Sequence, residues 1–223
     1  MTIESLWESL TGEPLTGVAI VTIKGDVRYV NDQAVSILFG SGAKSGEYLG
    51  KNVRDYLPAE WVRERLKVLQ QVLTTGKPVA LRSIWRGHQQ IAWIRYIDPE
   101  ESESGEDGAC ESPAQFLCII RRVPGDEAVG EMVDESKFEF VESQMIELGP
   151  LDVLTPRELE VLALIGQGLS LKEIASALYR TVKTVEKHRA AIGMKLAAHD
   201  RVKLAEIANR AGLTTRDAAR ERV

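Results

Sequence analysis

The sequence predicts an α+β protein in two parts: an antiparallel sheet with flanking helices, then an all-α, four-helix helix-turn-helix domain. Residues 15–124 alternate between strand-like and helix-like patterns, whereas residues 150–223 keep helical spacing throughout. The charge divides at the same place. Residues 1–149 hold 15 Lys and Arg against 24 Asp and Glu, but residues 150–223 hold 13 against 9. Opposite charge indicates modules with different partners, and only the second has the positive charge that suits nucleic acid.

The first module, residues 1–124, opens with two predicted strands and a short helix. GVAIVTIKGDVRYVN (residues 17–31) contains two β-branched runs joined by a tight turn at Lys24-Gly25-Asp26. DQAVSILFG (residues 32–40) has apolar residues at helical spacing and a final glycine that stops the helix.

A long helix and three further strands complete the first module. PAEWVRERLKVLQQVLTTG (residues 58–76) has one apolar face, a proline near its start and a glycine at its end. Residues 78–98 predict a hairpin that turns near Arg86-Gly87-His88, and residues 115–123 predict a further strand. Between them, residues 99–113 carry six Asp or Glu and predict an extended acidic loop.

Residues 125–149 form an acidic connector between the modules. Its apolar residues fall roughly three and four apart, which predicts a helical linker able to pack on a partner helix or on either module. A solvated linker with a few apolar contacts is the alternative, and the spacing does not separate the two.

The second module contains four short helices with clear start signals. Thr155-Pro156-Arg157-Glu158 combines a cap, a proline at the first helical position and a capping-box glutamate. Ser170 with Glu173 repeats the capping box for the second helix, and Thr181 caps the third. The fourth helix is predicted over Arg201 to Ala211. Two short helices joined by a tight turn and braced by further helices are typical of a helix-turn-helix.

The third helix, TVKTVEKHRAAIGMKL (residues 181–196), separates an apolar face from an outward face. At about 100° per residue, its buried side is predicted to hold Val182, Val185, Ile192 and Leu196. Its outward side is predicted to hold Lys183, Lys187, Ala190, Ala191 and Met194. A helix in the major groove needs cations for phosphates and short side chains for close approach. A merely solvated helix, the alternative, more often carries Lys and Glu where this one has two alanines and a methionine.

Leu154 to Leu213 resembles the DNA-binding domain of the LuxR/FixJ family, and LTPRELEVLALIGQGLSLKEIASALYRTVKTVEKHRAAIGMKL follows the family pattern densely. The resemblance implies that Thr184, Glu186, Lys187 and Ala190 meet bases or nearby phosphates. It also implies that Thr155, Lys172 and Lys195 lie near the DNA backbone. Together with the cap and the outward face, the predicted DNA-binding residues are Thr155, Lys172, Thr181, Lys183, Thr184, Glu186, Lys187, Ala190 and Lys195.

The turn before the third helix departs from the family pattern. Tyr179 stands where the turn often has Gly, and Arg180 stands where an apolar residue is common. Thr181 replaces the usual Ser, which preserves the cap. The geometry of this turn is therefore less well defined by the resemblance than the third helix is.

The order of elements in the first module resembles a PAS domain. The resemblance rests on the paired opening strands with Asn31 and a following Ala34, on LGKNVRDYLP (residues 49–58) and on the long helix. It implies a sensing or dimerisation domain. Neither the parallel sheet with an acidic pocket of a receiver domain nor the aromatic pattern of an acyl-homoserine-lactone domain is evident.

No cofactor and no metal site are predicted for this module. GKNVR (residues 50–54) is similar to the Gly-x-Asn-Cys-Arg stretch of light-sensing LOV domains, but Val53 stands in the cysteine position, so a thiol adduct with flavin cannot form there. Non-covalent flavin stays open as an alternative. His88, expected at a hairpin turn, and Cys118, expected as a small buried residue, are poor candidates for haem ligands.

The remaining features limit the function. No apolar run approaches the roughly 20 residues that cross a bilayer. The N-terminus lacks the pattern of a secretory signal, and two cysteines give neither a disulfide framework nor metal-ligand spacing. We expect a cytoplasmic, non-enzymatic transcriptional regulator that binds double-stranded DNA as a homodimer. RNA polymerase and an unidentified small ligand in the PAS-like domain are further candidate partners, and no membrane partner is expected.

Two other functions remain open. One is a sigma-like or anti-activator regulator that uses the helical domain to dock on protein. The other is a flavin-binding PAS photosensor. The EKHR stretch around His188 also admits a phosphotransfer histidine, but no ATP-binding or receiver motif accompanies it.

Overall fold

The computed structural model describes residues 16–97, 113–123 and 133–223. The predicted acidic loop and the first part of the predicted linker lie largely outside these residues. The chain divides into two compact units. Unit 1 comprises residues 1–82, 91–122 and 133–143, and unit 2 comprises residues 83–90, 123–132 and 144–223.

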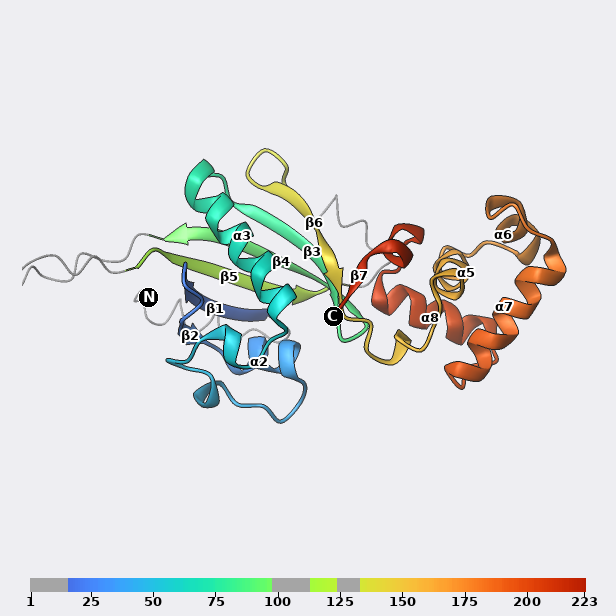
Figure 1. Ribbon diagram of the computed structural model, residues 1–223, viewed down its shortest axis with the longest axis horizontal. Helices are drawn as coiled ribbons and strands as arrows, with labels where there is room; N and C mark the ends of the chain where they lie inside the picture. The colour runs from blue at the N-terminus through green and yellow to red at the C-terminus, as the bar shows by residue number, and fades with distance from the viewer. Residues whose placement is uncertain (1–15, 98–112, 124–132) are drawn as a thin grey trace, which may run out of the picture. The chain divides into compact units, whose positions relative to one another are not determined.

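The strands form one sheet in the order β2-β1-β5-β4-β3-β6-β7 (Figure 1). Strand β1 pairs antiparallel with both β2 and β5, which confirms the paired opening strands. The strands are β1 (Thr16–Thr22), β2 (Val27–Val30), β3 (Val79–Trp85), β4 (His88–Ile97), β5 (Gln115–Arg122), β6 (Glu139–Ile146) and β7 (Glu221–Arg222). The hairpin turn between β3 and β4 is confirmed, because Arg86 and Gly87 take φ values of 52° and 69°, as a two-residue hairpin requires.

Helix α2 (Asp32–Phe39) is fixed to β1 by Asn31. The Asn31 side-chain oxygen accepts hydrogen bonds from the backbone N–H of Ala34 and of Val18, both at 2.9 Å. The helix also comes very close to the strand, since a Cβ on Gly17 would lie 2.7 Å from Cα of Ala34. Asn31 is thus both the cap of the helix and its link to the sheet.

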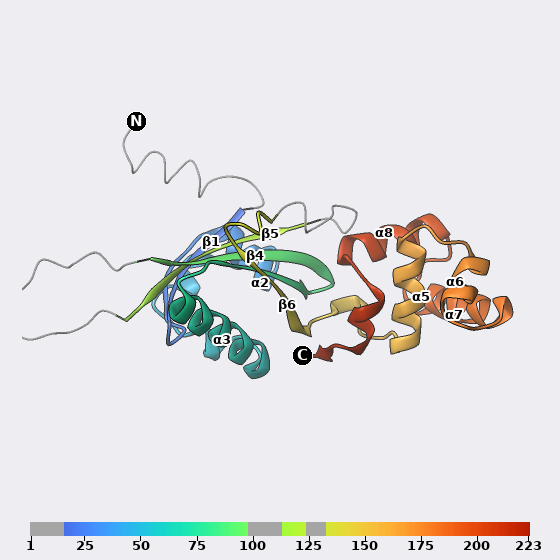
Figure 2. The same cartoon turned by 90° about the horizontal axis from the view of Figure 1, so that it is seen from above.

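Two 3₁₀ turns, η1 (Ser45–Glu47) and η2 (Val53–Asp55), lead to the long helix α3 (Ala59–Thr75). Helix α3 lies across one face of the sheet (Figure 2). It buries Trp61, Val62, Val68, Leu69 and Val72. Part of this face joins Val79, Leu81, Ile94 and Phe116 in the core of unit 1. The helix predicted over residues 58–76 is confirmed.

The prediction of a helical linker is wrong over residues 139–146, because these residues form strand β6. Strand β6 lies next to β3 in the sheet. Without it the backbone of β3, whose seven residues are all buried, would lack partners on one side. Pairing with a distant strand therefore overrides the helical spacing of this segment. Residues 125–132 of the predicted linker lie outside the described residues.

The described helices of unit 2 are those of the predicted all-α domain, preceded and followed by short turns. They are η3 (Gly149–Leu151), α5 (Pro156–Gly166), α6 (Leu171–Ala177), α7 (Val182–Lys195), α8 (Arg201–Ala211) and η4 (Thr215–Ala219). Their shared core includes Leu159, Leu162, Ile174, Ile192 and Leu204, each at most 1% exposed. The predicted fold class, a PAS-like antiparallel sheet with flanking helices and a four-helix helix-turn-helix domain, is confirmed.

The core of unit 2 extends beyond the four helices. Ile84 of β3, Ile146 of β6 and Leu148 belong to the same buried cluster, at 1%, 0% and 2% exposure. The chain end closes this core, because β7 pairs in parallel with β6 and the N–H of Val223 donates to the carbonyl of Ile146 at 3.1 Å. Asp217, fully buried, pairs with Arg220 at 3.0 Å. None of these contacts was predicted.

Within the described part of the chain, no helix combines the length and the apolar character needed to span a bilayer.

Candidate nucleic-acid interface

A local cap fixes where each of the helices α6 and α7 begins. Ser170 and Glu173 form the predicted capping box of α6. The Thr181 hydroxyl oxygen accepts a hydrogen bond from the N–H of Thr184 at 3.2 Å, and the two threonine hydroxyls lie 2.9 Å apart. The hydroxyl of Thr184 is therefore engaged in the cap of α7.

The turn between the two helices holds a strained residue. Tyr179 has a φ of +52°, a left-handed conformation that is unfavourable for a bulky side chain. The N–H of Arg180 donates to the carbonyl of Ala175 at 2.8 Å, which closes the end of α6. The turn thus holds a tyrosine in a left-handed conformation at the position where the resemblance leads one to expect glycine.

Helix α7 turns one face into the core and the other outward. Val185 and Ile192 are 1% and 0% exposed, so they fix its rotation. Met194 is 71% exposed, and Lys183, Lys187 and Ala190 are exposed as predicted. Two assignments were wrong: Val182, expected inside, is 36% exposed, and Ala191, expected outside, is partly buried. Val182 is the first residue of α7, where the helix has not yet entered the core.

The nine predicted DNA-binding residues fall into three places. Lys183, Glu186, Lys187 and Ala190 lie exposed on α7, close to its capped start at Thr181 and Thr184. Lys172 lies exposed in the first turn of α6. The remaining two, Thr155 and Lys195, meet at the side chain of Glu158. Because α7 spans 14 residues, Lys195 lies about 20 Å from the start of the helix.

The Glu158 carboxylate binds three donors. One of its oxygens accepts hydrogen bonds from the N–H of Thr155 at 2.8 Å, from the Thr155 hydroxyl at 3.0 Å and from Nζ of Lys195 at 2.6 Å. Burial acts to raise the pKa of Glu158, but the hydrogen bonds from Lys195 and Thr155 outweigh it and hold that pKa below 4.5. The Lys195 charge is thus already paired inside the domain, and Lys195 joins the end of α7 to the start of α5.

Two exposed residues beside α7 were not among the predicted set. Tyr179 is 90% exposed and Arg180 is exposed next to the cap of α7. The sequence feature that could have drawn attention to Tyr179 and Arg180 is their departure from the family pattern at this turn. Arg180 adds a cation next to the N-terminal start of α7, where the helix dipole is also positive.

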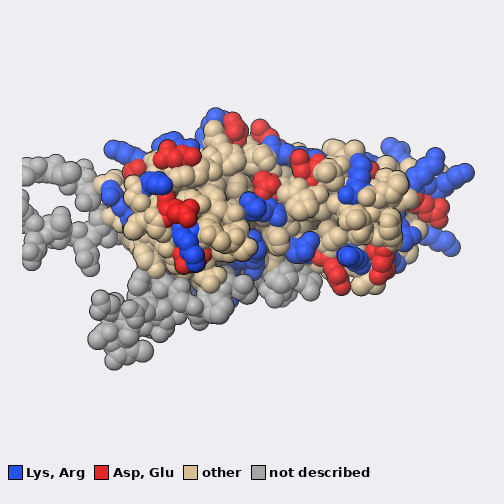
Figure 3. Space-filling view, turned by 90° about the horizontal axis from the view of Figure 1, so that it is seen from below, with Lys and Arg blue, Asp and Glu red and all other residues tan. Residues whose placement is uncertain are grey.

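Lys and Arg side chains gather on the part of unit 2 that α6 and α7 form, with a few Asp or Glu among them (Figure 3). Cations of this kind bind phosphates, and a helix start with exposed N–H groups does the same. Short residues such as Ala190 permit close approach of the helix axis to base edges. The arrangement suits a helix that enters the major groove from its capped end.

The segment similar to LOV domains has structural contacts of its own. Nδ2 of Asn52 donates to Oδ1 of Asp26 at 2.8 Å and to the carbonyl of Lys24 at 3.1 Å. Arg54 donates to the same carbonyl at 2.7 Å. These contacts hold η2 against the turn between β1 and β2, so Asn52 and Arg54 have a structural role in unit 1.

Groups that could carry redox or metal chemistry are few in the described residues. No set of three His, Cys, Asp or Glu side chains there lies close enough to hold a metal ion. Burial raises the pKa of the Cys118 thiol to about 12, so it is a poor nucleophile at neutral pH. His88 begins β4 beside the hairpin turn, with Nδ1 2.9 Å from the carbonyl of Arg86.

Comparison with known proteins matches the second module. Residues 152–208 fit the family model described as bacterial regulatory proteins, luxR family. Oxygen regulatory protein NreC of Staphylococcus epidermidis is 40% identical over 80 residues, which cover 36% of this chain and 35% of that protein. NreC of Staphylococcus aureus is 46% identical over 59 residues, which cover 26% and 27%. The match therefore spans about a third or less of the length of these curated relatives.

Two solved structures show a weaker likeness to this chain. VqmA of Vibrio cholerae, in a complex with ligand and DNA, is 20% identical, with 96% of this chain and 90% of that chain covered at a TM-score of 0.48. The PAS domain of an HTR-like protein from Haloarcula marismortui is 16% identical, with 54% and 91% covered at a TM-score of 0.38. Likeness at these scores carries no functional assignment, which rests on the family match and on the residues of unit 2.

Proposed function

We propose that this chain, whose residues 152–208 form a helix-turn-helix domain of the LuxR family, is a sequence-specific DNA-binding transcriptional regulator. The observation that carries the proposal is the orientation of α7. Buried Val185 and Ile192 turn Lys183 and Lys187 outward, behind the capped helix α6. The PAS-like first module would control DNA binding by sensing a signal or by dimerisation, and no catalytic step is required of either module.

Each α7 would enter a major groove with its capped start leading. Lys183 and Lys187 would neutralise phosphates, which supplies much of the affinity and makes it salt-dependent. Glu186 could accept a hydrogen bond from a cytosine amino group, and Ala190 could contact a thymine methyl group. A homodimer would place two such helices on half-sites about 34–36 Å apart.

Charge reversal at Lys187 tests the proposal. A selection of bound fragments from random DNA would first supply a target site. Lys187→Glu should then weaken binding to that site by about tenfold or more and lower the slope of affinity against salt by about 1 to 2. Fluorescence anisotropy at several salt concentrations measures both.

The matched control is Lys203→Glu, which makes the same charge change at an exposed position of α8. It should lower affinity only through net charge, by much less than Lys187→Glu. Equal effects of the two substitutions, or none from Lys187→Glu, would contradict the proposed role of α7.

A protein-docking function for the helical domain is the second candidate. The exposed apolar side chains of Tyr179, Met194 and Val202, at 90%, 71% and 63% exposure, favour it. DNA selection that recovers no preferred sequence, together with unchanged weak DNA binding in Lys187→Glu, would support docking over sequence-specific DNA recognition.

A further inference from the structure

The residue immediately before the cap distinguishes α7 from the two helices that precede it in unit 2. Leu154 stands before the cap of α5 and is 1% exposed, and the partly buried Leu169 stands before the cap of α6. Both belong to the buried core that also holds the fourth residue of each helix, Leu159 and Ile174. An apolar pair at these two positions is a hydrophobic staple, which fixes the direction in which the chain enters the helix.

Arg180 occupies the position before the cap of α7, where it cannot complete such a staple. Val185, the fourth residue of α7, is 1% exposed, whereas Arg180 is exposed. The Arg180 guanidinium makes one long hydrogen bond, at 3.5 Å, to the carbonyl of Tyr179, and no carboxylate of the described residues lies within ion-pair distance of it. A leucine here would bury apolar surface as in α5 and α6, so the stability of the free protein does not account for this arginine.

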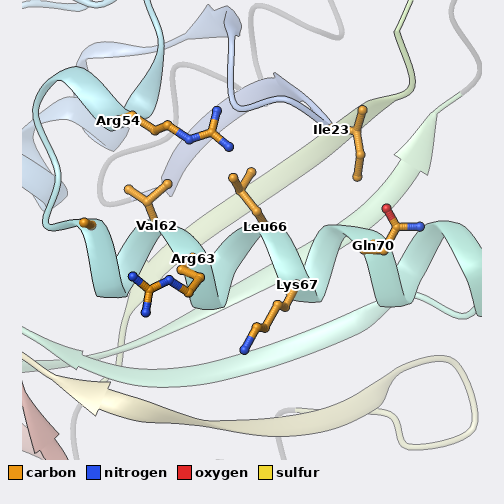
Figure 4. Close-up of a pocket in the computed structure, with 8 residues that line it drawn as sticks. Ile23, Arg54, Val62, Arg63, Leu66, Lys67 and Gln70 are labelled. Carbon is orange, nitrogen blue, oxygen red and sulfur yellow. The ribbon is translucent and has the colours of Figure 1, made fainter.

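The exposed cations along α3 of unit 1 provide a contrast. Arg63 and Lys67 line a groove there, but their charged ends lie on the side of α3 away from Arg54 (Figure 4). Arg63 also lies 3.8 Å from the carboxylate of Glu60. These cations share no anion site, and Arg63 has an acidic neighbour on its own helix. Arg180 has no such neighbour among the described residues, so its anion has to come from outside the chain.

The start of α7 is itself unfavourable for cations in the free protein. The N-terminal end of a helix dipole is positive, and an acidic residue in the first turn offsets it. Glu158 in α5 and Glu173 in α6 take this place. The first turn of α7 has no acidic residue and contains Lys183. Arg180 and Lys183 therefore add positive charge where the helix is already positive.

Tyr179 adds a second unfavourable feature directly before Arg180. Its φ of +52° is a left-handed conformation, and strained backbone of this kind gathers at functional sites. The Tyr179 side chain is 90% exposed, and its hydroxyl makes no hydrogen bond to a described residue. Packing thus offsets neither the strain nor the exposure. Both the phenol of Tyr179 and the guanidinium of Arg180 are hydrogen-bond donors that suit phosphate oxygens.

We propose that Tyr179 and Arg180 bind the DNA backbone at the edge of the major groove that α7 enters. Arg180 makes a charge-assisted contact to one phosphate, and the hydroxyl of Tyr179 donates to a neighbouring phosphate. A duplex carries one negative charge per about 1.7 Å of its axis, so each side chain meets its own phosphate and the two need not converge. DNA thereby supplies the anion that is missing at the start of α7.

Tyr179 and Arg180 are positioning residues in this arrangement, because phosphate contacts fix the register of a helix on the duplex and carry no sequence information directly. The inference rests on the proposed function. It adds to the interface two residues that neither the outward face of α7 nor the family resemblance indicates.

Arg180→Leu tests the inference, because a structural role and a DNA-binding role predict opposite effects of this change. It completes the staple, so the melting temperature should stay the same or rise by about 2–4 °C. The same variant should weaken binding to the selected DNA site and to a scrambled site by a similar factor of about tenfold. It should also lower the slope of affinity against salt by about 1. Fluorescence anisotropy at several salt concentrations measures the binding.

Two further variants and a control separate the contributions. Arg180→Lys keeps the charge, so it should retain the salt slope and lose less affinity than Arg180→Leu. Tyr179→Phe removes only an exposed hydroxyl, so it should weaken binding about threefold to tenfold at an unchanged melting temperature. The matched control Arg216→Leu removes the same charge at an exposed position of η4 and should change the affinity by less than about twofold.

Failure of this inference is distinguishable from failure of the proposed function. Wild-type affinity and salt slope in Arg180→Leu and Tyr179→Phe, with binding lost in Lys187→Glu, would overturn the inference alone. Equal losses in Arg180→Leu and Arg216→Leu would also overturn it, because a general effect of net charge would then explain both. Unchanged binding in Lys187→Glu as well as in Arg180→Leu would contradict the proposed function itself and favour docking of the helical domain on protein.

Discussion

Glu158 stands where the start of α5 and the end of α7 meet. Its carboxylate closes the capping box of α5 and also accepts a hydrogen bond from Lys195, which lies 37 residues further along the chain. If the Glu158 carboxylate lost its charge, the Lys195 ammonium and the N–H of Thr155 would lose their charged acceptor, which is costly at a partly buried site. The contact between the end of α7 and the start of α5 therefore depends on the ionisation of Glu158, in addition to the apolar core that the two helices share.

Glu158→Gln should lower the free energy of unfolding by about 1–3 kcal/mol at pH 7, because it removes the charge that Lys195 and Thr155 bind. Urea unfolding of the full-length protein measures the change. Glu173→Gln is the matched control, since Glu173 closes the capping box of α6 at an exposed position, and its effect should be smaller.

The pH dependence of the stabilisation by Glu158 follows from the direction in which folding shifts the pKa of Glu158. Folding lowers the pKa of Glu158 from 4.5, so the stabilisation is fully present above pH 4.5 and is lost as the pH falls through the lower, folded value. The difference in stability between wild type and Glu158→Gln should therefore shrink in acid. A difference that grows as the pH falls would show that folding raises the pKa of Glu158 instead of lowering it.

Tyr179 holds a left-handed conformation that costs a non-glycine residue about 1–3 kcal/mol, and its 90% exposed side chain gains little from packing. Tyr179→Gly should raise the free energy of unfolding by about 0.5–1 kcal/mol, after allowance for the greater freedom of glycine in the unfolded chain. Thermal unfolding measures this change. Ala197→Gly, at a φ of +50°, is the control and should stabilise similarly. Stability that falls in Tyr179→Gly alone would show that the tyrosine ring contributes contacts beyond its backbone.

At the scale of elements, the end of α8 is fitted against the β3–β4 hairpin within unit 2. Gly212 caps α8 with a φ of +56°, and a Cβ there would lie 2.3 Å from Oε1 of Gln89. Gln89 is itself only 2% exposed, so it has little room to move. Gly212 is thus required both by backbone conformation and by space.

Gly212→Ala should destabilise the protein by about 2–4 kcal/mol, from left-handed strain and overpacking together. Gly168→Ala is the matched control, because Gly168 has a φ of +82° with no atom within 4 Å of the added Cβ. Gly168→Ala should be destabilised only by backbone strain, by about 1 kcal/mol. Chemical denaturation compares the two, and equal losses would show that Gln89 moves aside without penalty.

Elements set by neighbouring residues were the ones that the sequence predicted well. The caps at Thr155, Ser170 and Thr181 are local patterns of a few residues, and all three are confirmed. Strand β6 and the chain end β7 depend on partners far away in the sequence, and the helical spacing of residues 139–146 pointed to the wrong element. The same limit hid the pairing of Lys195 with Glu158, because nothing near either residue indicates the other.

At the scale of the whole molecule, the family match and the compact unit have different boundaries. Residues 152–208 fit the family model, but unit 2 also includes residues 83–90 and everything from residue 144 to the chain end. Ile146 and Leu148, at 0% and 2% exposure, are part of its core. The helix-turn-helix is therefore built into a larger folded body than its sequence pattern suggests.

A fragment of residues 144–223 should accordingly be more stable than one of residues 150–223. The shorter fragment loses two fully buried side chains and the β6 residues that pair with β7, a loss of about 3 kcal/mol or more by comparison with large-to-small substitutions in cores. Urea unfolding followed by circular dichroism measures the difference. Replacing Ile146 by Ala in the longer fragment separates the loss of a buried side chain from the loss of strand pairing. This variant removes the side chain but keeps the pairing, so it should show only part of the stability loss of the shorter fragment. Equal stability of the two fragments would mean that the four helices form a complete core by themselves, and that residues 144–149 join them without stabilising them.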